Sequence, residues 1–138
     1  MKSSPVTAHD ALIYVMVMAS AVDSAMSDRE LGRIGLLVRS LPVFAGFSED
    51  RLIAVTQDCA NLLGGPEGMD ITLETIRDAL PPRLYDTAYA LAVDVMSADL
   101  AVQPEEIRLL QLLRDRLRLD KLTCAALERG AIARNRAL

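Results

Sequence analysis

The chain carries one acidic pattern twice, 76 residues apart, and this repeat restricts the possible folds more than any other feature. Residues 15–41 align with residues 91–117 without a gap, and seven of the 27 positions are identical. The shared pattern, D-x-A-[MV]-x-x-x-E, begins at Asp23 in the first copy and at Asp99 in the second. It predicts a duplicated unit in which two helices are joined by a short acidic connector.

Each copy also contains the signals that start a helix just after its connector. In the first copy Ser27 and Glu30 have the spacing of a capping box, in which side chains satisfy free backbone N–H groups. In the second copy Gln103 stands at the N-cap position, Pro104 at the first helical position and Glu106 at the third. We therefore expect Glu30 and Glu106 to lie in the first turns of equivalent helices.

The rest of the chain also indicates helices separated by Gly, Pro and polar connectors. Apolar residues recur at helical spacing, and no strand-like alternation of useful length is present. The sequence predicts an all-α fold and a single domain over residues 1–138, with an aliphatic core because only 4% of the residues are aromatic. Seven helices are expected, at about 7–22, 27–40, 48–63, from Asp70 or Thr72 to 80, 82–98, from 103, and 120–136.

Composition and targeting signals favour a cytoplasmic protein that does not bind nucleic acid. The net charge is −4, whereas nucleic-acid binders usually carry a basic balance. The apolar stretch over residues 11–19 is shorter than the roughly 20 residues that span a membrane, and no cleavage signal follows it. Cys59 and Cys124 have no metal-binding spacing, so we expect buried free thiols and a reducing compartment.

The acidic connectors have two interpretations that the residues alone leave open. In the structural one, Asp23 and Asp99 are turn residues and the two glutamates only cap helices. In the other, the connectors meet and four carboxylates, from Asp23, Glu30, Asp99 and Glu106, bind a divalent cation. Ca²⁺ and Mg²⁺ are the candidates because both prefer oxygen ligands.

Other residues that could carry chemistry have simpler explanations. The single histidine, His9, lies near the N-terminus with no nucleophile paired to it in sequence, and a surface or cap role is expected. The glycine-rich residues 64–68 lack the features of a phosphate loop and are expected to be a plain loop. Asp94 interrupts an apolar helix, so it either faces solvent, pairs with an arginine or joins the acidic residues. We expect no enzyme.

The two copies, residues 21–30 and 97–106, resemble the paired A-D-G-x-[IV]-x-x-x-E signatures of the tellurite-resistance TerB family. The resemblance extends to the helical layout of nearly the whole chain. It implies a seven-helix TerB-like fold with a pseudo-twofold core and an acidic, cation-binding patch made by Asp23, Glu30, Asp99 and Glu106. The glycine of the family signature is replaced by Ser24 and Leu100 in this chain, and Ala25 and Ala101 follow them.

The resemblance also sets the expected function. It implies a non-enzymatic accessory domain of tellurite or general stress resistance that works with protein partners, in the family often in membrane-associated complexes. The domain would present its acidic patch to a divalent cation or to a basic partner. The alternative is a helical protein–protein interaction or scaffold domain with no metal site. The sequence predicts no oligomeric state.

Overall fold

A computed structural model describes residues 5–21, 26–97 and 103–138, and all of its regular structure is helical. The described residues contain no strand, which confirms the all-α prediction. Short 3₁₀ turns over Pro42–Phe44, Glu49–Arg51 and Pro82–Leu84 join longer helices. The α-helices are α1 (Ala8–Ser20), α2 (Asp28–Ser40), α3 (Leu52–Gly64), α4 (Gly68–Ala79), α5 (Tyr85–Met96), α6 (Pro104–Leu117) and α7 (Lys121–Arg134).

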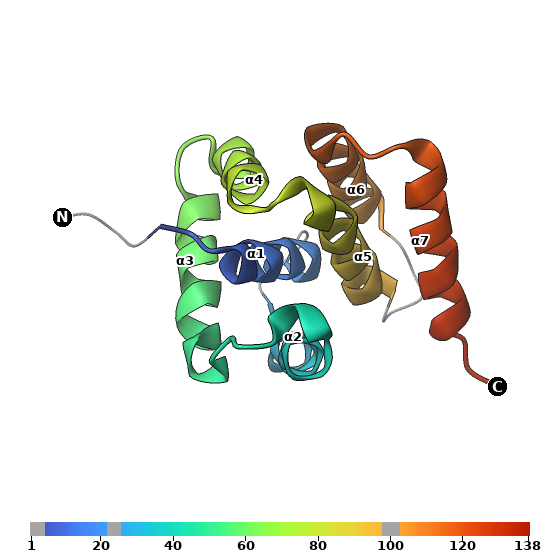
Figure 1. The fold of residues 1–138 in the computed structure, drawn as a ribbon, viewed down its shortest axis with the longest axis horizontal. Helices are drawn as coiled ribbons and strands as arrows, with labels where there is room; N and C mark the ends of the chain where they lie inside the picture. The colour runs from blue at the N-terminus through green and yellow to red at the C-terminus, as the bar shows by residue number, and fades with distance from the viewer. Residues whose placement is uncertain (1–4, 22–25, 98–102) are drawn as a thin grey trace.

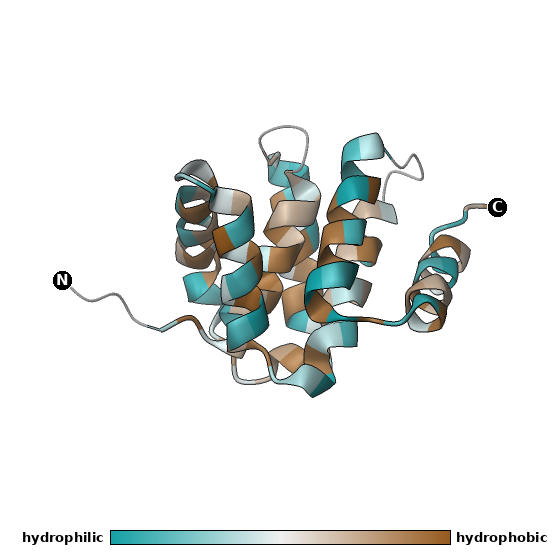
Figure 2. Ribbon diagram, turned by 90° about the horizontal axis from the view of Figure 1, so that it is seen from above, coloured by the Kyte–Doolittle hydropathy of each residue, from teal (hydrophilic) through white to brown (hydrophobic). Residues whose placement is uncertain are grey.

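Two apolar helices, α1 and α5, pack against each other at the centre of the molecule. Every residue of α1 from Asp10 to Ser20 is buried, because other helices cover it on several sides. In Figure 1, α2 lies below α1, α3 to its left and α4 above it, whereas α6 and α7 lie beside α5. Figure 2 shows that hydrophobic residues gather on the helix sides that face the interior. The core is aliphatic, as the composition predicts.

Helix starts follow the predicted caps where a side chain can reach the first turn. The Ser27 hydroxyl accepts a hydrogen bond from the Glu30 N–H at 3.2 Å, so α2 begins where the sequence predicts. The Asp120 carboxylate accepts from the Thr123 N–H at 3.1 Å and starts α7. These bonds satisfy N–H groups that lack partners within the helix.

Three predicted helix starts were wrong in detail. The fifth helix was expected from Pro82, but a 3₁₀ turn over Pro82–Leu84 precedes α5. Ser48 makes no capping hydrogen bond, and a 3₁₀ turn separates it from α3. Helix α4 begins at Gly68 rather than at Asp70 or Thr72. The α4 start depends on Glu67, whose φ of 51° is left-handed, and on Gly68, where a Cβ would lie 2.1 Å from the Leu63 carbonyl oxygen. Only glycine fits such an approach.

The duplication stays a prediction, because identical residues of the two copies are not equally buried. Leu113 and Leu117 of α6 are buried, whereas their counterparts Leu37 and Leu41 are half-buried. Helix α2 instead buries Ile34 and Val38. The two amphipathic helices therefore do not present equivalent faces to the core.

Within the described ranges, no helix combines the length and the apolar character needed to cross a membrane.

Candidate functional site

The predicted acidic site is described only in its two glutamates. Asp23 and Asp99 lie outside the residues that the structure describes. Glu30 and Glu106 both stand at the third position of their helices, α2 and α6, and both are half-buried. One carboxylate oxygen of Glu30 accepts a hydrogen bond from the Ser27 N–H at 2.8 Å. Glu106 accepts from the Gln103 N–H, also at 2.8 Å. Both glutamates therefore cap helices.

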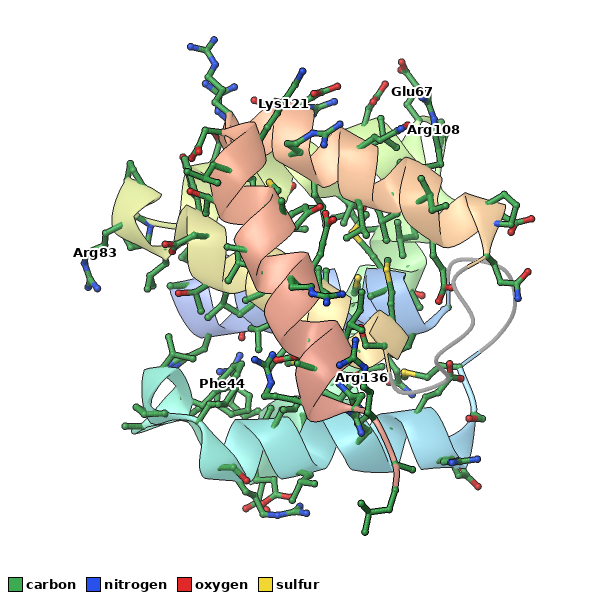
Figure 3. The ribbon with its side chains drawn as sticks, turned by 90° about the vertical axis from the view of Figure 1, so that its right-hand side faces the viewer. Phe44, Glu67, Arg83, Arg108, Lys121 and Arg136 are labelled. Carbon is green, nitrogen blue, oxygen red and sulfur yellow. The ribbon has the colours of Figure 1, made fainter. Side chains whose placement is uncertain are left out.

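The helix ends that flank the two acidic connectors lie on one side of the molecule. The C-terminal ends of α1 and α5 and the starts of α2 and α6 point to the upper edge in Figure 2. The same ends lie on the right in Figure 3. At this side Ser20, the last residue of α1, has a buried hydroxyl oxygen with no hydrogen-bond partner among residues 5–21, 26–97 and 103–138. Among the described residues, no three His, Cys, Asp or Glu side chains form a group that could hold a metal ion.

The residues that could carry nucleophilic or acid–base chemistry are engaged in packing. His9 makes a hydrogen bond with the Val43 carbonyl oxygen at 2.9 Å and stacks on Phe44, so it joins α1 to the 3₁₀ turn that follows α2. Cys59 and Cys124 are buried free thiols, as predicted. Burial raises the pKa of Cys59 to about 12, which keeps this thiol protonated and unreactive at neutral pH.

Sequence reasoning missed an open apolar groove between α6 and α7. Both helices pack against α5 but make few contacts with each other. The space between them forms a groove of about 380 Å³, within the range of small-molecule and peptide sites. We call it the α6–α7 groove. Its lining comprises Tyr89, Val93 and Met96 from the α5 floor, Ser97 just after α5, Ile107, Leu110, Gln111 and Arg114 from α6, and Glu128 and Ile132 from α7.

The rim of the α6–α7 groove exposes two large apolar side chains. Ile107 on α6 is 48% exposed and Ile132 on α7 is 43% exposed. These residues stand on opposite walls above an apolar floor that includes Val93. Apolar side chains that gather at an open groove are typical of a binding site rather than of ordinary surface.

One end of the α6–α7 groove is polar. The Tyr89 hydroxyl donates a hydrogen bond to Oε2 of Glu128 at 2.5 Å and thereby joins α5 to α7. Burial, with the Glu128 carboxylate beside it, raises the pKa of Tyr89. Arg114 of α6 lines the same groove, and its positive charge opposes part of this rise in the pKa of Tyr89. A cation and an anion therefore flank this end of the groove from opposite walls.

The position of α7 is fixed by polar contacts that sequence reasoning could not pair. Asp94, whose role was open, forms a salt bridge with Arg134 of α7 at 2.5 Å, so the arginine alternative is confirmed. Arg33 of α2 donates hydrogen bonds to the Asp94 carbonyl at 3.3 Å and to the Asn135 side chain at 3.5 Å. These contacts hold the far end of α7 and with it one wall of the groove.

Comparisons with known proteins identify no relative of this chain. No protein-family model, no curated protein and no solved structure matches the chain. The acidic helix ends and the α6–α7 groove are therefore the features of the structure that bear on function.

Proposed function

We propose that this chain is a non-enzymatic helical domain that binds a partner protein in the α6–α7 groove. One observation carries the proposal: two helices rest on a shared floor and leave an open, largely apolar space between them. Ile107 and Ile132 stay exposed at its rim, although burying each would be favourable by about 1–2 kcal/mol. A partner that covers them supplies this free energy.

The composition of the α6–α7 groove supports a protein as the partner. Its walls are two helices, and amphipathic helices commonly bind in grooves of this kind through apolar residues at helical spacing. Its polar groups, including Gln111 and Arg114, stand at one wall where they can orient what binds. The engagement of His9 and both cysteines in packing supports a binding rather than a catalytic role.

Site-specific photo-crosslinking in the native host tests this proposal. Gln111, which is exposed and lines the groove, is replaced by p-benzoylphenylalanine. We expect a discrete crosslinked protein, which mass spectrometry identifies and which then binds the purified domain. Ile132→Glu should abolish the crosslink because a carboxylate in the apolar wall must be desolvated when the partner binds.

Leu122→Glu is the matched control, because Leu122 is also on α7, is 79% exposed and does not line the groove. It should leave the crosslink intact. A crosslink that is absent in the wild type, or that both glutamate variants remove equally, would contradict the proposal.

A second candidate function is the TerB-like one, in which the domain serves tellurite or stress resistance in the cytoplasm. In this proposal Asp23, Glu30, Asp99 and Glu106 form an acidic patch that binds Ca²⁺ or Mg²⁺ or a basic partner, which can belong to a membrane-associated complex. It is supported by the helix ends beside both connectors, which lie on one side of the molecule. The buried Ser20 hydroxyl at that side, which no described residue hydrogen-bonds, adds an oxygen that suits such ions.

Titration with CaCl₂ or MgCl₂, followed by ¹⁵N NMR, tests the ion proposal. We expect the amide signals of residues 26–30 and 103–106 to shift together at millimolar ion. The double variant Glu30→Gln/Glu106→Gln should lose the shifts yet remain folded, because glutamine also serves at the third position of a capping box. Glu49→Gln removes an exposed carboxylate elsewhere and should change nothing. Absence of shifts in the wild type would rule out the ion.

A further inference from the structure

We propose that the occupant of the α6–α7 groove is an amphipathic helix that places one carboxylate against Arg114. This inference rests on the proposed binding function of the groove and adds the chemistry of the partner. It follows from three features: a cation at the groove's polar end, the length of the groove wall, and the charge of the surrounding helices.

Arg114 is the residue that favours an anionic group on the occupant. Its side chain is half-buried in the groove wall and forms no salt bridge or hydrogen bond with any residue in the described ranges. A purely apolar occupant would remove water from this guanidinium without replacing the lost interactions, which opposes binding. A carboxylate on the occupant removes that penalty and can accept two parallel hydrogen bonds from the guanidinium.

The occupant does not need a positive charge to pair with Glu128 on the opposite wall. One of its carboxylate oxygens already accepts the short hydrogen bond from Tyr89. Arg114 lines the opposite wall, and its charge lowers the pKa of the Tyr89 hydroxyl whereas the charge of Glu128 raises it. An incoming carboxylate would therefore leave Arg114 between two anions, an arrangement that a guanidinium with five N–H donors can satisfy.

The length of the groove favours a helix of at least two turns. Ile107 and Arg114 stand seven residues apart on α6, which corresponds to about 10 Å along a helix. A bound helix repeats this spacing from its residue i to residue i+7. Apolar residues at i and at i+3 or i+4 would cover Ile107, Ile132 and Val93, and an Asp or Glu at i+7 would reach Arg114.

The charge distribution of the chain favours an acidic occupant at this side. Residues 103–138 contain eight Lys and Arg against five Asp and Glu, whereas the rest of the chain contains seven against fourteen. Figure 3 looks onto α7 and shows Lys121, Arg108 and Arg136 around α6 and α7. A negatively charged helix is thus attracted to the groove side and repelled by the remainder of the surface.

Three labelled synthetic helices provide the test. All have leucine at i, i+3 and i+4 in one host sequence, and they carry Glu, Gln or Lys at i+7. Binding to the purified full chain is followed by fluorescence anisotropy at neutral pH, and ¹⁵N NMR locates the contact. We expect the Glu peptide to bind about tenfold more tightly than the Gln peptide. The Lys peptide should bind more weakly still.

Two variants of the chain assign this preference to one residue. Arg114→Gln should abolish the difference between the Glu and Gln peptides, because it removes the charge but breaks no salt bridge within the described chain. Arg129→Gln removes a charge of α7 that is not part of the groove lining and should preserve the difference.

Each contrary result has a distinct meaning. Equal binding of all three peptides at the groove would overturn the carboxylate inference and leave the groove proposal standing. No binding by any peptide, together with groove shifts caused by dodecanoate, would overturn the helix in favour of a small amphiphile. No binding by any peptide and no Ile132-dependent crosslink would overturn both proposals.

Discussion

Tyr89 is the largest of the fully buried side chains, and its hydroxyl makes one of the polar contacts that join α5 to α7. Tyr89→Phe keeps the packing of the ring and removes only the hydrogen bond to Glu128. A hydrogen bond to a charged group contributes about 2 kcal/mol, so we expect the free energy of unfolding to fall by about that amount. Urea denaturation followed by circular dichroism measures the change.

Tyr85→Phe is the matched control for that measurement. The Tyr85 hydroxyl donates to the Arg77 carbonyl at 3.2 Å, and the side chain is half-buried. A neutral hydrogen bond near the surface contributes about 1 kcal/mol or less, so this variant should lose less stability. Equal losses of unfolding free energy in the two variants would mean that the hydrogen bond to Glu128 contributes no more than a neutral one.

Cys59 makes the stability of the fold sensitive to alkaline pH. Burial raises the pKa of this thiol to about 12. The pKa of a thiol in an unfolded chain is about 8.5. Above that pH the unfolded state therefore releases a proton that the folded state retains. The stability is therefore fully present below about pH 8.5 and falls as the pH rises toward 12, by up to about 1.4 kcal/mol per unit.

Cys59→Ala should flatten this pH dependence. The difference in unfolding free energy between wild type and variant should shrink from neutral pH to pH 11, measured by urea denaturation at each pH. Val55→Ala is the control, because Val55 is buried on the same helix and does not titrate. Its effect should stay constant with pH. A constant difference for Cys59→Ala as well would contradict the account.

At the scale of the helix, the sequence predicted most elements because their starts depend on neighbouring residues. Ser27 with Glu30 and Asp120 with Thr123 are local pairs, and a reader of the sequence can recognise them. The start of α4 could not be predicted, because it depends on how closely Gly68 approaches the Leu63 carbonyl. That distance is set by the packing of α3 on α4, which is not encoded in any local pattern.

Two serines, Ser27 and Ser48, are both predicted from the sequence to start helices, and they allow a direct test of capping. Ser27 and Ser48 are both exposed and both precede helical turns, but only Ser27 accepts a capping hydrogen bond. Ser27→Ala should lower the free energy of unfolding by about 1 kcal/mol. Ser48→Ala should change it by less than about 0.5 kcal/mol. Thermal or urea unfolding distinguishes them, and similar losses would show that the cap contributes little.

At the scale of the whole molecule, the sequence predicted the class of fold but not the α6–α7 groove. Ile107 and Leu110 belong to the same apolar run as the core residues Leu109 and Leu113, so the run by itself does not separate groove from core. The separation depends on where α7 packs, and α7 is held by Asp94 and Arg33, which are distant in sequence. The groove is therefore a property of the assembled fold.

Helix α7 should be the element that opens most easily, because it packs mainly on α5 and has only two buried residues, Cys124 and Ala131. We expect its amide hydrogens to exchange with solvent faster than those of α5, as measured by mass spectrometry. Asp94→Ala removes the Arg134 salt bridge and should speed exchange in α7 roughly threefold, since a partly exposed pair contributes under about 1 kcal/mol.

Asp70→Ala is the control for α7, because it removes a salt bridge to Arg116 that joins α4 to α6 and should leave exchange in α7 unchanged.

A partner helix in the groove contacts Ile132 of α7 and so should slow hydrogen exchange in α7 without changing exchange in α3, on the opposite side of the molecule. If α7 exchanges as slowly as α5, it is a fixed part of the core. The groove would then be a rigid slot that could accept only a helix already matched to its width.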